Sequence, residues 1–396
     1  DNVTFGGYTV MSKGEVMGRM CFTACFLGIP YLFGSLNKTS HAYYFTADFK
    51  TGKISSTYLD QYQGPTKIND ISVNENLKRT NLLIENVPDK QTYNLDILEL
   101  NNKGEKTKKL NVKLDRERSI NNARMTYIKN KDIVLIGTYA AGKKNYKQGG
   151  GSNVSTSIQG LFIGKIVDEK PQFIKFYNFS KFKQFFSYLN ERSQKKVEKR
   201  IKRKEKKGEE LDYKYNLLVH DIIEQEDTYI MVAEAFYPEY HTETYTTCTS
   251  NGCTTHTRLV FDGYRYTHAM IAGFSKDGEL LWDNCFEIAN ILTFNLKERV
   301  KVLMQENNNI ALVYNFGGKI YSKVFNGNNV VSSKESESIE TNFPGDKVKT
   351  NFGSDIDFWY DNYMIAYGYQ RIKNKDAEKG EKKRRTVFYF NKISYQ

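Results

Sequence analysis

One pattern recurs six times along the 396 residues and limits the folds open to this chain. An apolar and aromatic run is followed by a second such run, a tight polar turn and a shorter third run. The second runs are centred near residues 46, 97, 163, 271, 322 and 390. Recurrence at roughly 50 residues is typical of a β-propeller, whose blades bury their faces only by stacking on one another.

We therefore predict an all-β fold, with residues 1–396 forming a single β-propeller domain of six or seven blades. Two stacked β-sandwiches are the alternative. The paired runs are 29–36 with 42–59, 81–86 with 93–112, 132–140 with 160–179, 229–237 with 268–288, 309–316 with 319–336, and 363–370 with 386–395.

The composition fits this fold class, and the first residues of the sequence indicate a location. Aromatic residues make up 14% of the chain, with 28 Tyr and 25 Phe, a bias that suits half-buried pleated sheets. No window approaches 18 uninterrupted apolar residues, so we expect no membrane-spanning helix. The chain begins DNVTFGG without Met, which predicts a removed export signal and a periplasmic location, although an engineered start would read the same.

Residues 180–208 interrupt the strand pattern and predict an inserted amphipathic helix. Ser180 is the expected N-cap and Gly208 the residue just past the end. The apolar side chains at helical spacing should pack on the propeller, whereas the second half should project into solvent. These apolar side chains are Phe182, Phe185, Phe186 and Leu189.

The second half of this helix carries more than half of the net charge. From Lys195 to Lys207, nine of thirteen residues are basic and two are acidic, against a net charge of +12 for the chain. A solvated helix end is one interpretation, and a contact for an acidic protein surface or anionic lipid is the other. The basic loop 371–385 adds slightly to the second. The candidate partner-binding residues are Lys195, Lys196, Lys199, Arg200, Lys202, Arg203, Lys204, Lys206 and Lys207.

Nucleic acid is not an expected partner. The charged half of the run has no interleaved aromatic residues, and the chain carries no RRM, KH or helix-turn-helix signature. No cofactor-binding motif is present either, so we expect no cofactor.

A second insertion, residues 238–262, predicts an exposed two-stranded ribbon. A four-residue loop, 249–252, would place Cys248 opposite Cys253, at a distance that a disulfide can span. In that register Glu243 faces Arg258. A disulfide would indicate an oxidising compartment, and free thiols are the alternative.

The same ribbon argues against a metal site. His256 is three residues from Cys253 and His241 is seven from Cys248. Odd spacings in a strand put side chains on opposite faces, whereas tetrahedral zinc needs convergent ligands. We expect Cys285 in the core, and Cys21 and Cys25 as buried thiols.

Catalytic candidates are scattered. His220 lies in an apolar strand-like run and is expected in the core. His268, near Tyr264, Tyr266 and Asp262, would line a polar pocket or join a buried hydrogen-bond network. A glycosidase needs two carboxylates placed about the propeller channel, and nothing in the sequence selects two. The available carboxylates are Asp262, Asp283, Glu287, Asp355 and Asp357.

The stretch FSKDGELLWDN (274–284) resembles the aspartate box of sialidase-type propellers, with one residue too few between Asp277 and Gly278. We interpret it as a structural hairpin in which Gly278 takes a positive φ and Trp282 packs between blades.

Two longer stretches carry a family resemblance. FYNFSKFKQFFSYL (176–189) and VFDGYRYTHAMIAGFSKDGELLWDNCFEI (260–288) resemble exported β-propeller-like proteins of Bacteroidota, over about residue 132 to the C-terminus. Among such envelope proteins the resemblance implies one role, that of the plug subunits of the type IX secretion translocon. It implies a non-enzymatic cap that docks on an outer-membrane β-barrel channel. The alternative is a glycan-binding or glycan-active propeller with a site in its central channel.

Overall fold

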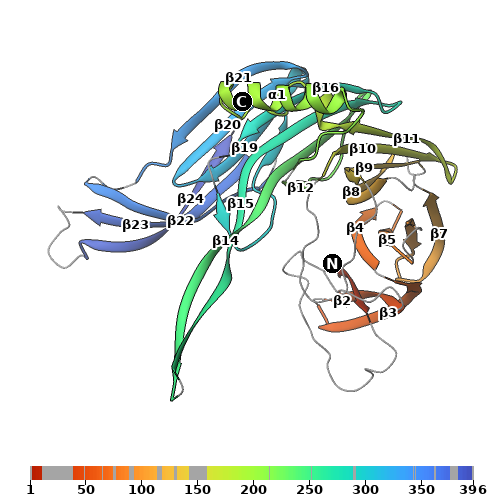
Figure 1. Cartoon of the computed structure of the whole chain (residues 1–396), viewed down its shortest axis with the longest axis horizontal. Helices are drawn as coiled ribbons and strands as arrows, with labels where there is room; N and C mark the ends of the chain where they lie inside the picture. The colour runs from red at the N-terminus through yellow and green to blue at the C-terminus, as the bar shows by residue number, and fades with distance from the viewer. Residues whose placement is uncertain are drawn as a thin grey trace. The chain divides into compact units, whose positions relative to one another are not determined.

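Figure 1 shows the computed structural model of the chain. It describes residues 2–10, 39–48, 50–64, 66–74, 77–88, 93–113, 118–128, 132–141, 158–213, 215–250, 252–288, 291–341, 343, 345–360, 363–374 and 382–394. Cys21, Cys25 and the run 29–36 lie outside the described residues.

The first three sheets are antiparallel meanders. The first is β1 (Asn2–Val10), β2 (Thr39–Asp48) and β3 (Lys53–Gln63). The second is β4 (Thr66–Asn74), β5 (Arg79–Asn86), β6 (Asn94–Leu100) and β7 (Lys106–Lys113). The third is β8 (Arg118–Ile128), β9 (Asp132–Ala141), β10 (Gly160–Val167) and β11 (Lys170–Asn178).

The remaining three sheets follow the same plan. The fourth has β12 (Asn216–Val219), β14 (Thr228–Thr249), β15 (Gly252–Ser275) and β16 (Leu280–Glu287), with short β13 (Ile223–Gln225) and β17 (Leu292–Thr293) beside it. The fifth has β18 (Lys301–Met304), β19 (Ile310–Phe316), β20 (Lys319–Asn326) and β21 (Asn329–Ser338). The sixth has β22 (Asp346–Phe358), β23 (Tyr363–Asn374) and β24 (Arg384–Ser394).

The fold is an all-β propeller, as predicted, and the described residues hold six of its sheets. In the second to fifth sheets the predicted paired runs correspond to the second, third and fourth strands, and in the sixth sheet to β23 and β24. In the first sheet, the run 42–59 corresponds to β2 and β3. The described chain divides into two compact units, one of residues 1–182, 195–232 and 273–280, the other of residues 183–194, 233–272 and 281–396. A single domain stays a prediction.

Both faces of the second sheet are buried. In β5, Leu82 packs with Tyr44 and Leu98, whereas its neighbour Leu83 packs with Ile97 and with residues of the third sheet. Adjacent strand residues point to opposite faces, so the continuous apolar run in β5 supplies a core on each side. Complete burial of a leucine side chain is worth about 1.5–3 kcal/mol.

A buried carboxylate in β4, the first strand of the second sheet, joins this sheet to its neighbour. Asp70 in β4 accepts hydrogen bonds from Arg124 Nη1 and from the backbone N–H of Met125, both at 2.8 Å, in β8. Arg124 Nε also donates to the carbonyl of Val219 in β12. The Asp70 carboxylate therefore connects the first strands of the second and third sheets, and Arg124 extends the contact to β12 of the fourth sheet.

The inserted helix is shorter than predicted. The helix, α1 (Glu191–Glu205), begins after Asn190, whose side chain accepts a hydrogen bond from the backbone N–H of Ser193 at 3.0 Å. Residues 182–190 form turns instead of helix, with Phe182 and Phe185 buried. The predicted cap at Ser180 is therefore wrong, because Asn190 caps the helix directly before the charged run. The predicted end is confirmed, since Gly208 has a φ of +67°.

The hairpin that resembles an aspartate box is structural, as interpreted. Gly278 has a φ of +79°, and a Cβ added there would lie 2.3 Å from the ring of Phe173. The hydroxyl of Tyr177 donates to the Gly278 carbonyl at 2.6 Å. The turn therefore requires glycine for both conformation and space.

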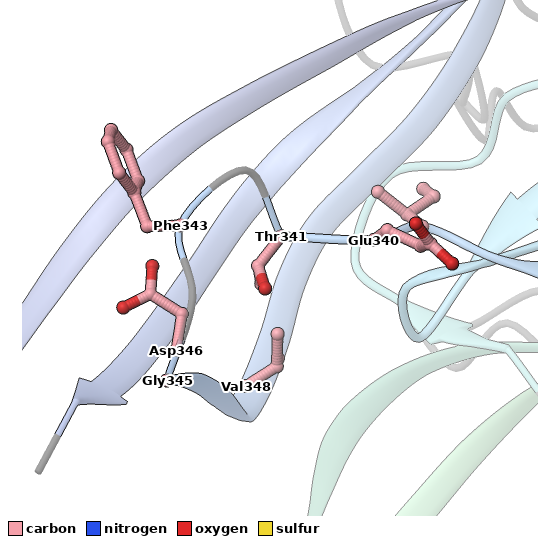
Figure 2. Close-up of a pocket in the computed structure, with 7 residues that line it drawn as sticks. Glu340, Thr341, Phe343, Gly345, Asp346 and Val348 are labelled. Carbon is pink, nitrogen blue, oxygen red and sulfur yellow. The ribbon is translucent and has the colours of Figure 1, made fainter. Parts of the chain in front are cut away.

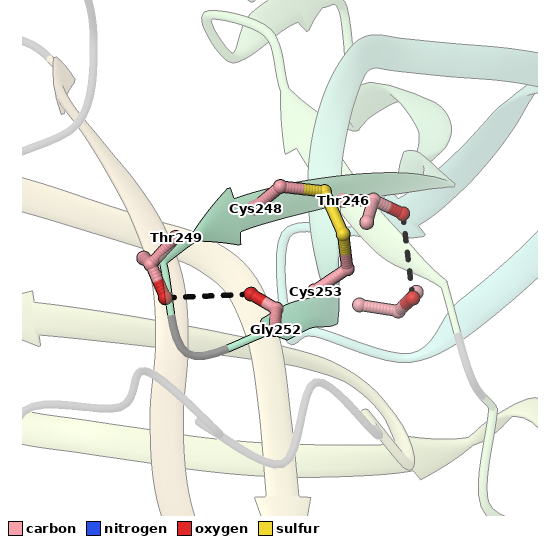
Figure 3. The surroundings of a disulfide bond; sticks show 6 residues. Thr246, Cys248, Thr249, Gly252 and Cys253 are labelled. Atoms are coloured by element: carbon pink, nitrogen blue, oxygen red, sulfur yellow. Dashed lines mark hydrogen bonds between the residues drawn. A yellow bond between two sulfur atoms is a disulfide. The ribbon is translucent and has the colours of Figure 1, made fainter.

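The predicted ribbon is present. β14 and β15 continue as an exposed two-stranded ribbon, and a disulfide joins Cys248 to Cys253 near its tip (Figures 1 and 3). Glu243 pairs with Arg258 at 2.8 Å, in the predicted register. His241 bonds Asp262 at 2.5 Å, while His256 stacks on Tyr245 with 5.3 Å between ring centroids.

No helix in the described part of the chain is long and apolar enough to span a membrane.

Reduction of the Cys248–Cys253 disulfide should loosen the ribbon without unfolding the protein. The bridge closes a loop with a sequence separation of only 5, and the surrounding side chains are exposed, so its effect should stay local. We expect faster amide hydrogen exchange within residues 244–257 after reduction, and a change below about 1 kcal/mol in global unfolding free energy. A lower midpoint for the whole molecule would contradict this local role.

Candidate functional site

A cluster of charged side chains and one tyrosine forms at the end of β22, beside β18 and the segment that leads into it. Asp355 and Asp357 lie on one face of β22, while Ile356 between them points into the core. Their partners across β23 are Tyr367 and Ile365. All the side chains of this cluster, which we call the Asp357 cluster, belong to the second unit. They are Lys297, Arg299, Lys301, Asp355, Asp357 and Tyr367.

Asp355 is the buried member. Its side chain is 8% exposed, pairs with Lys297, and lies 4.0 Å from Arg299 Nη1. The side-chain amide of Asn315, in β19, donates to the Asp355 carbonyl at 2.8 Å. Side chain and backbone of Asp355 are therefore both fixed.

Asp357 is the accessible member. Its side chain is 47% exposed and lies 2.6 Å from Lys301 Nζ, and the hydroxyl of Tyr367 donates to it at 3.0 Å. Burial acts to raise the pKa of Asp357, but the hydrogen bond and charge of Lys301 outweigh it, and the pKa is lowered. Asp357 is therefore ionised at neutral pH.

The hydroxyl of Tyr367 is a donor at neutral pH. Burial and then the charge of Asp355 raise its pKa to about 12, so the phenol keeps its proton. The cluster thus presents an ionised carboxylate between an ammonium and a phenol, an arrangement that can both accept and donate hydrogen bonds.

A buried carboxylate positions the cations. Glu234 in β14 accepts hydrogen bonds from the backbone N–H groups of Arg299 and Val300, at 2.7 and 2.9 Å. The hydroxyl of Tyr266 donates to the Lys297 carbonyl at 2.7 Å. The segment with Lys297 and Arg299 is therefore held by β14 and β15, although it has no regular secondary structure itself.

An exposed aromatic turn borders the cluster. Phe358, Trp359 and Tyr360 follow Asp357 directly and are 55%, 52% and 45% exposed. Lys392 Nζ, on β24, lies 2.6 Å from the Tyr360 hydroxyl and 3.4 Å from the ring centroid of Tyr363. Flat apolar surfaces therefore stand next to fixed polar groups.

Three of the five sequence-predicted carboxylates lie elsewhere. Asp283 accepts hydrogen bonds from the backbone N–H groups of Lys183 and Gln184, at 2.8 and 2.7 Å. Asp262 bonds His241, and Glu287 lies 3.7 Å from Lys334. Only Asp355 and Asp357 come together, and the sequence did not single them out.

His268 and His220 are core residues. His268 is fully buried and stacks on Tyr188 with 3.7 Å between ring centroids, and burial lowers its pKa to about 3. His220 is 6% exposed, and its backbone N–H donates to the Val232 carbonyl. His268 Nδ1 also lies 3.0 Å from the Thr267 hydroxyl, so this histidine joins a buried hydrogen-bond network, one of its two predicted roles. Within the described residues, no group of three or more potential metal ligands gathers.

The basic residues of α1 stay partner-binding candidates that no observation tests. None of the helix is buried, and Lys204 pairs with Glu209 at 2.9 Å. The other eight candidates are exposed at the surface of α1 and just beyond it.

A separate open pocket of ≈ 610 Å³ lies where β21 connects to β22 (Figure 2). Its charged wall, Asp346, accepts hydrogen bonds from Arg385 at 2.7 Å and from Asn374 at 2.9 Å. The Asp346 carboxylate is therefore occupied by structural hydrogen bonds. The side chains that remain exposed to a ligand in this pocket are mainly Phe343 and Glu340.

Comparison with known proteins gives a likeness of fold and no family. No family model matches the chain, and no curated protein matches it. The polysaccharide lyase Uly1 is 11% identical over 89% of this chain and 85% of its own, with a TM-score of 0.29. The GH93 alpha-L-arabinofuranosidase of Fusarium graminearum is 11% identical over 84% of each chain, with a TM-score of 0.34. The NanB sialidase of Streptococcus pneumoniae is 9% identical over 89% of this chain and 73% of its own, with a TM-score of 0.28.

These comparisons correct two expectations. The three structures named above are a lyase, a glycosidase and a sialidase, and none is a secretion plug. The comparisons therefore stand against the expected non-enzymatic role and the expected plug function, and neither expectation is retained. The resemblance to exported Bacteroidota proteins gains no support either. TM-scores this low assign no substrate, so the glycan alternative has to rest on the site.

Loss of the Lys301 charge should raise the pKa of Asp357. In Lys301→Met, burial acts on the carboxylate without the lysine that opposes it. Carbon-detected NMR titration of labelled aspartate, assigned with Asp357→Asn, measures the shift. Lys301→Arg keeps the charge and should keep the pKa low. An unchanged pKa in Lys301→Met would show that Lys301 is not its cause.

Buried His268 should make stability fall in acid. Its pKa is about 3 in the folded state and about 6.5 when exposed, so the unfolded state alone gains a proton between these values. The unfolding free energy should therefore fall as pH drops from 6.5 towards 3, by about 1.4 kcal/mol per pH unit from this group. Urea unfolding of His268→Gln should show a pH slope smaller by that amount. Equal slopes would mean that His268 takes up protons in the folded protein.

Proposed function

We propose that the protein is glycan-active, with the Asp357 cluster as the site that engages the sugar. A sugar ring offers hydroxyl groups that need donors and acceptors in fixed positions, and C–H faces that pack on aromatic rings. The cluster supplies a carboxylate, an ammonium and a phenol, and the turn beside it supplies Trp359 and Tyr360. This juxtaposition is the observation that carries the proposal.

Charge balance supports a ligand recognised through hydroxyl groups. Lys297 and Lys301 are each paired with an aspartate, so the cluster has little charge left with which to attract a simple ion. The exposed carboxylate oxygens of Asp357 keep lone pairs that can accept hydrogen bonds from ligand hydroxyls.

Enzymatic action would use Asp357 as a reacting carboxylate and Asp355 as a positioning residue. Glycoside hydrolysis employs a pair of carboxyl groups about the scissile bond, one of which stays ionised. The lowered pKa of Asp357 suits the ionised member. Asp355, held by Lys297 and Arg299, would position these cations and the strand end.

A location in the periplasm or at the outer membrane is part of this proposal. The Cys248–Cys253 disulfide supports it, because such bridges persist in oxidising compartments. The exposed cysteine pair should be recovered oxidised from the native host.

Asp357→Asn tests the proposal directly. Purified protein is screened against a panel of polysaccharides for binding by calorimetry and for release of new chain ends. We expect at least one polysaccharide to bind, and Asp357→Asn to weaken binding or turnover by about tenfold to a hundredfold, the value of hydrogen bonds to a charged group.

The matched control is Asp277→Asn, which removes the same charge from an exposed turn outside the cluster. It should bind and turn over glycan like the unaltered protein. Failure of the whole panel to bind, or equal behaviour of the two variants, would contradict the proposal.

A further inference from the structure

One face of the sixth sheet carries a ladder of exposed aromatic side chains. Phe352, Tyr369 and Phe388 are cross-strand neighbours on β22, β23 and β24. The ring centroids of Phe352 and Tyr369 lie 5.5 Å apart, and those of Tyr369 and Phe388 lie 5.3 Å apart. Phe390 follows two residues after Phe388 on β24. These four side chains, which we call the aromatic face, are 41–64% exposed.

The opposite face of the sheet is the one that packs. Ile356, Met364 and Ala366 join a buried cluster with residues of β19 and β20. Alternation along the strands therefore gives the sixth sheet one apolar core face and one aromatic exposed face. Large exposed aromatic surfaces of this kind mark interaction sites.

Basic residues continue the aromatic face at one end. Lys347, Lys373 and Arg384 lie directly opposite one another across the three strands, and Arg371 adds a fourth positive charge one row nearer the aromatic face. Within the part of the chain that the structure describes, none of the four pairs with a carboxylate. Like charges directly opposite each other destabilise a sheet, so an anionic ligand would relieve a cost that the fold leaves in place.

The Asp357 cluster lies at the other end of the same face. Cross-strand neighbours form successive rows along this face. The first row is Asp357, Ile365 and Lys392, and the second is Asp355, Tyr367 and Phe390. The rest of the aromatic face follows, and the basic row comes last. The nine residues of β23 from Ile365 to Lys373 span roughly 27 Å. The surface is long enough for an extended polymer that also reaches the cluster.

We infer that this face binds an acidic polysaccharide, one with carboxylate or sulfate groups along the chain. The basic row takes the acidic groups, the aromatic face packs on sugar rings, and the Asp357 cluster accepts hydroxyl groups. The inference rests on the proposed function and names its ligand class. A single-stranded nucleic acid fits less well, because its phosphates would meet the ionised Asp357 and its backbone offers that carboxylate no donor.

The test compares four defined probes by calorimetry at about 0.1 M salt, where exposed charges are only partly screened. Hyaluronan carries uronate groups, dextran sulfate carries sulfate, dextran is neutral, and poly(dT) is the nucleic acid. We expect hyaluronan, dextran sulfate or both to bind at least about tenfold more tightly than dextran and poly(dT), and the better of the two identifies the acidic group.

Matched variants locate the binding. Arg371→Gln with Arg384→Gln removes two charges from the basic row, and should weaken binding of the acidic probe by about tenfold or more. Lys199→Gln with Arg203→Gln removes two exposed charges from α1 and should leave binding unchanged. Phe388→Ala should weaken the acidic probe and dextran by similar factors. Circular dichroism and thermal unfolding confirm that each variant is folded.

The outcomes separate the inference from the proposed function. Glycan binding without preference for acidic probes, tighter binding of poly(dT), or equal loss from the α1 variant would overturn the inference and leave the glycan site standing. Acidic-probe binding that survives Asp357→Asn but not the basic-row variant would support the inference and overturn the cluster as the primary site. Failure of hyaluronan, dextran sulfate and dextran to bind would overturn the inference, and the wider panel decides the proposed function.

Discussion

Neighbouring sheets of this propeller depend on buried carboxylates that bind backbone N–H groups of the next sheet or of the segment that leads into it. Asp70 binds the N–H of Met125 between the second and third sheets, and Glu234 binds those of Arg299 and Val300 between the fourth and fifth. A buried carboxylate without such partners would be strongly destabilising. Each contact therefore fixes how two sheets meet, in addition to the apolar packing that holds them together.

The Asp357 cluster extends this device towards the surface. Glu234 holds the segment that carries Lys297 and Arg299, and these cations reach Asp355 in the sixth sheet. Two residues further along β22, Asp357 is only half-buried and keeps part of its surface in contact with solvent. A chain of structural contacts thus ends in a carboxylate on β22 that a ligand can reach.

The propeller organisation was predictable because strands buried on both faces produce apolar runs at a regular interval. β5 and β10 are such strands, and their runs stand out in the sequence. The first strands of the sheets were missed, because β4 and β22 mix charged and apolar residues and have no clear alternation. The candidate site lies on one of these missed strands. Asp355 and Asp357 were therefore only two of five candidate carboxylates, and no sequence pattern favoured them over the other three.

The sequence by itself determined the class of fold, the Cys248–Cys253 ribbon and the basic run that became α1, since each follows from local spacing and parity. Only the tertiary structure decided which carboxylates meet and which face of the last sheet stays exposed. Asp357 and Lys301 are 56 positions apart, and Phe352 meets Phe388 only through the register of β23. Such pairings depend on how strands align in space, and no local pattern encodes that alignment.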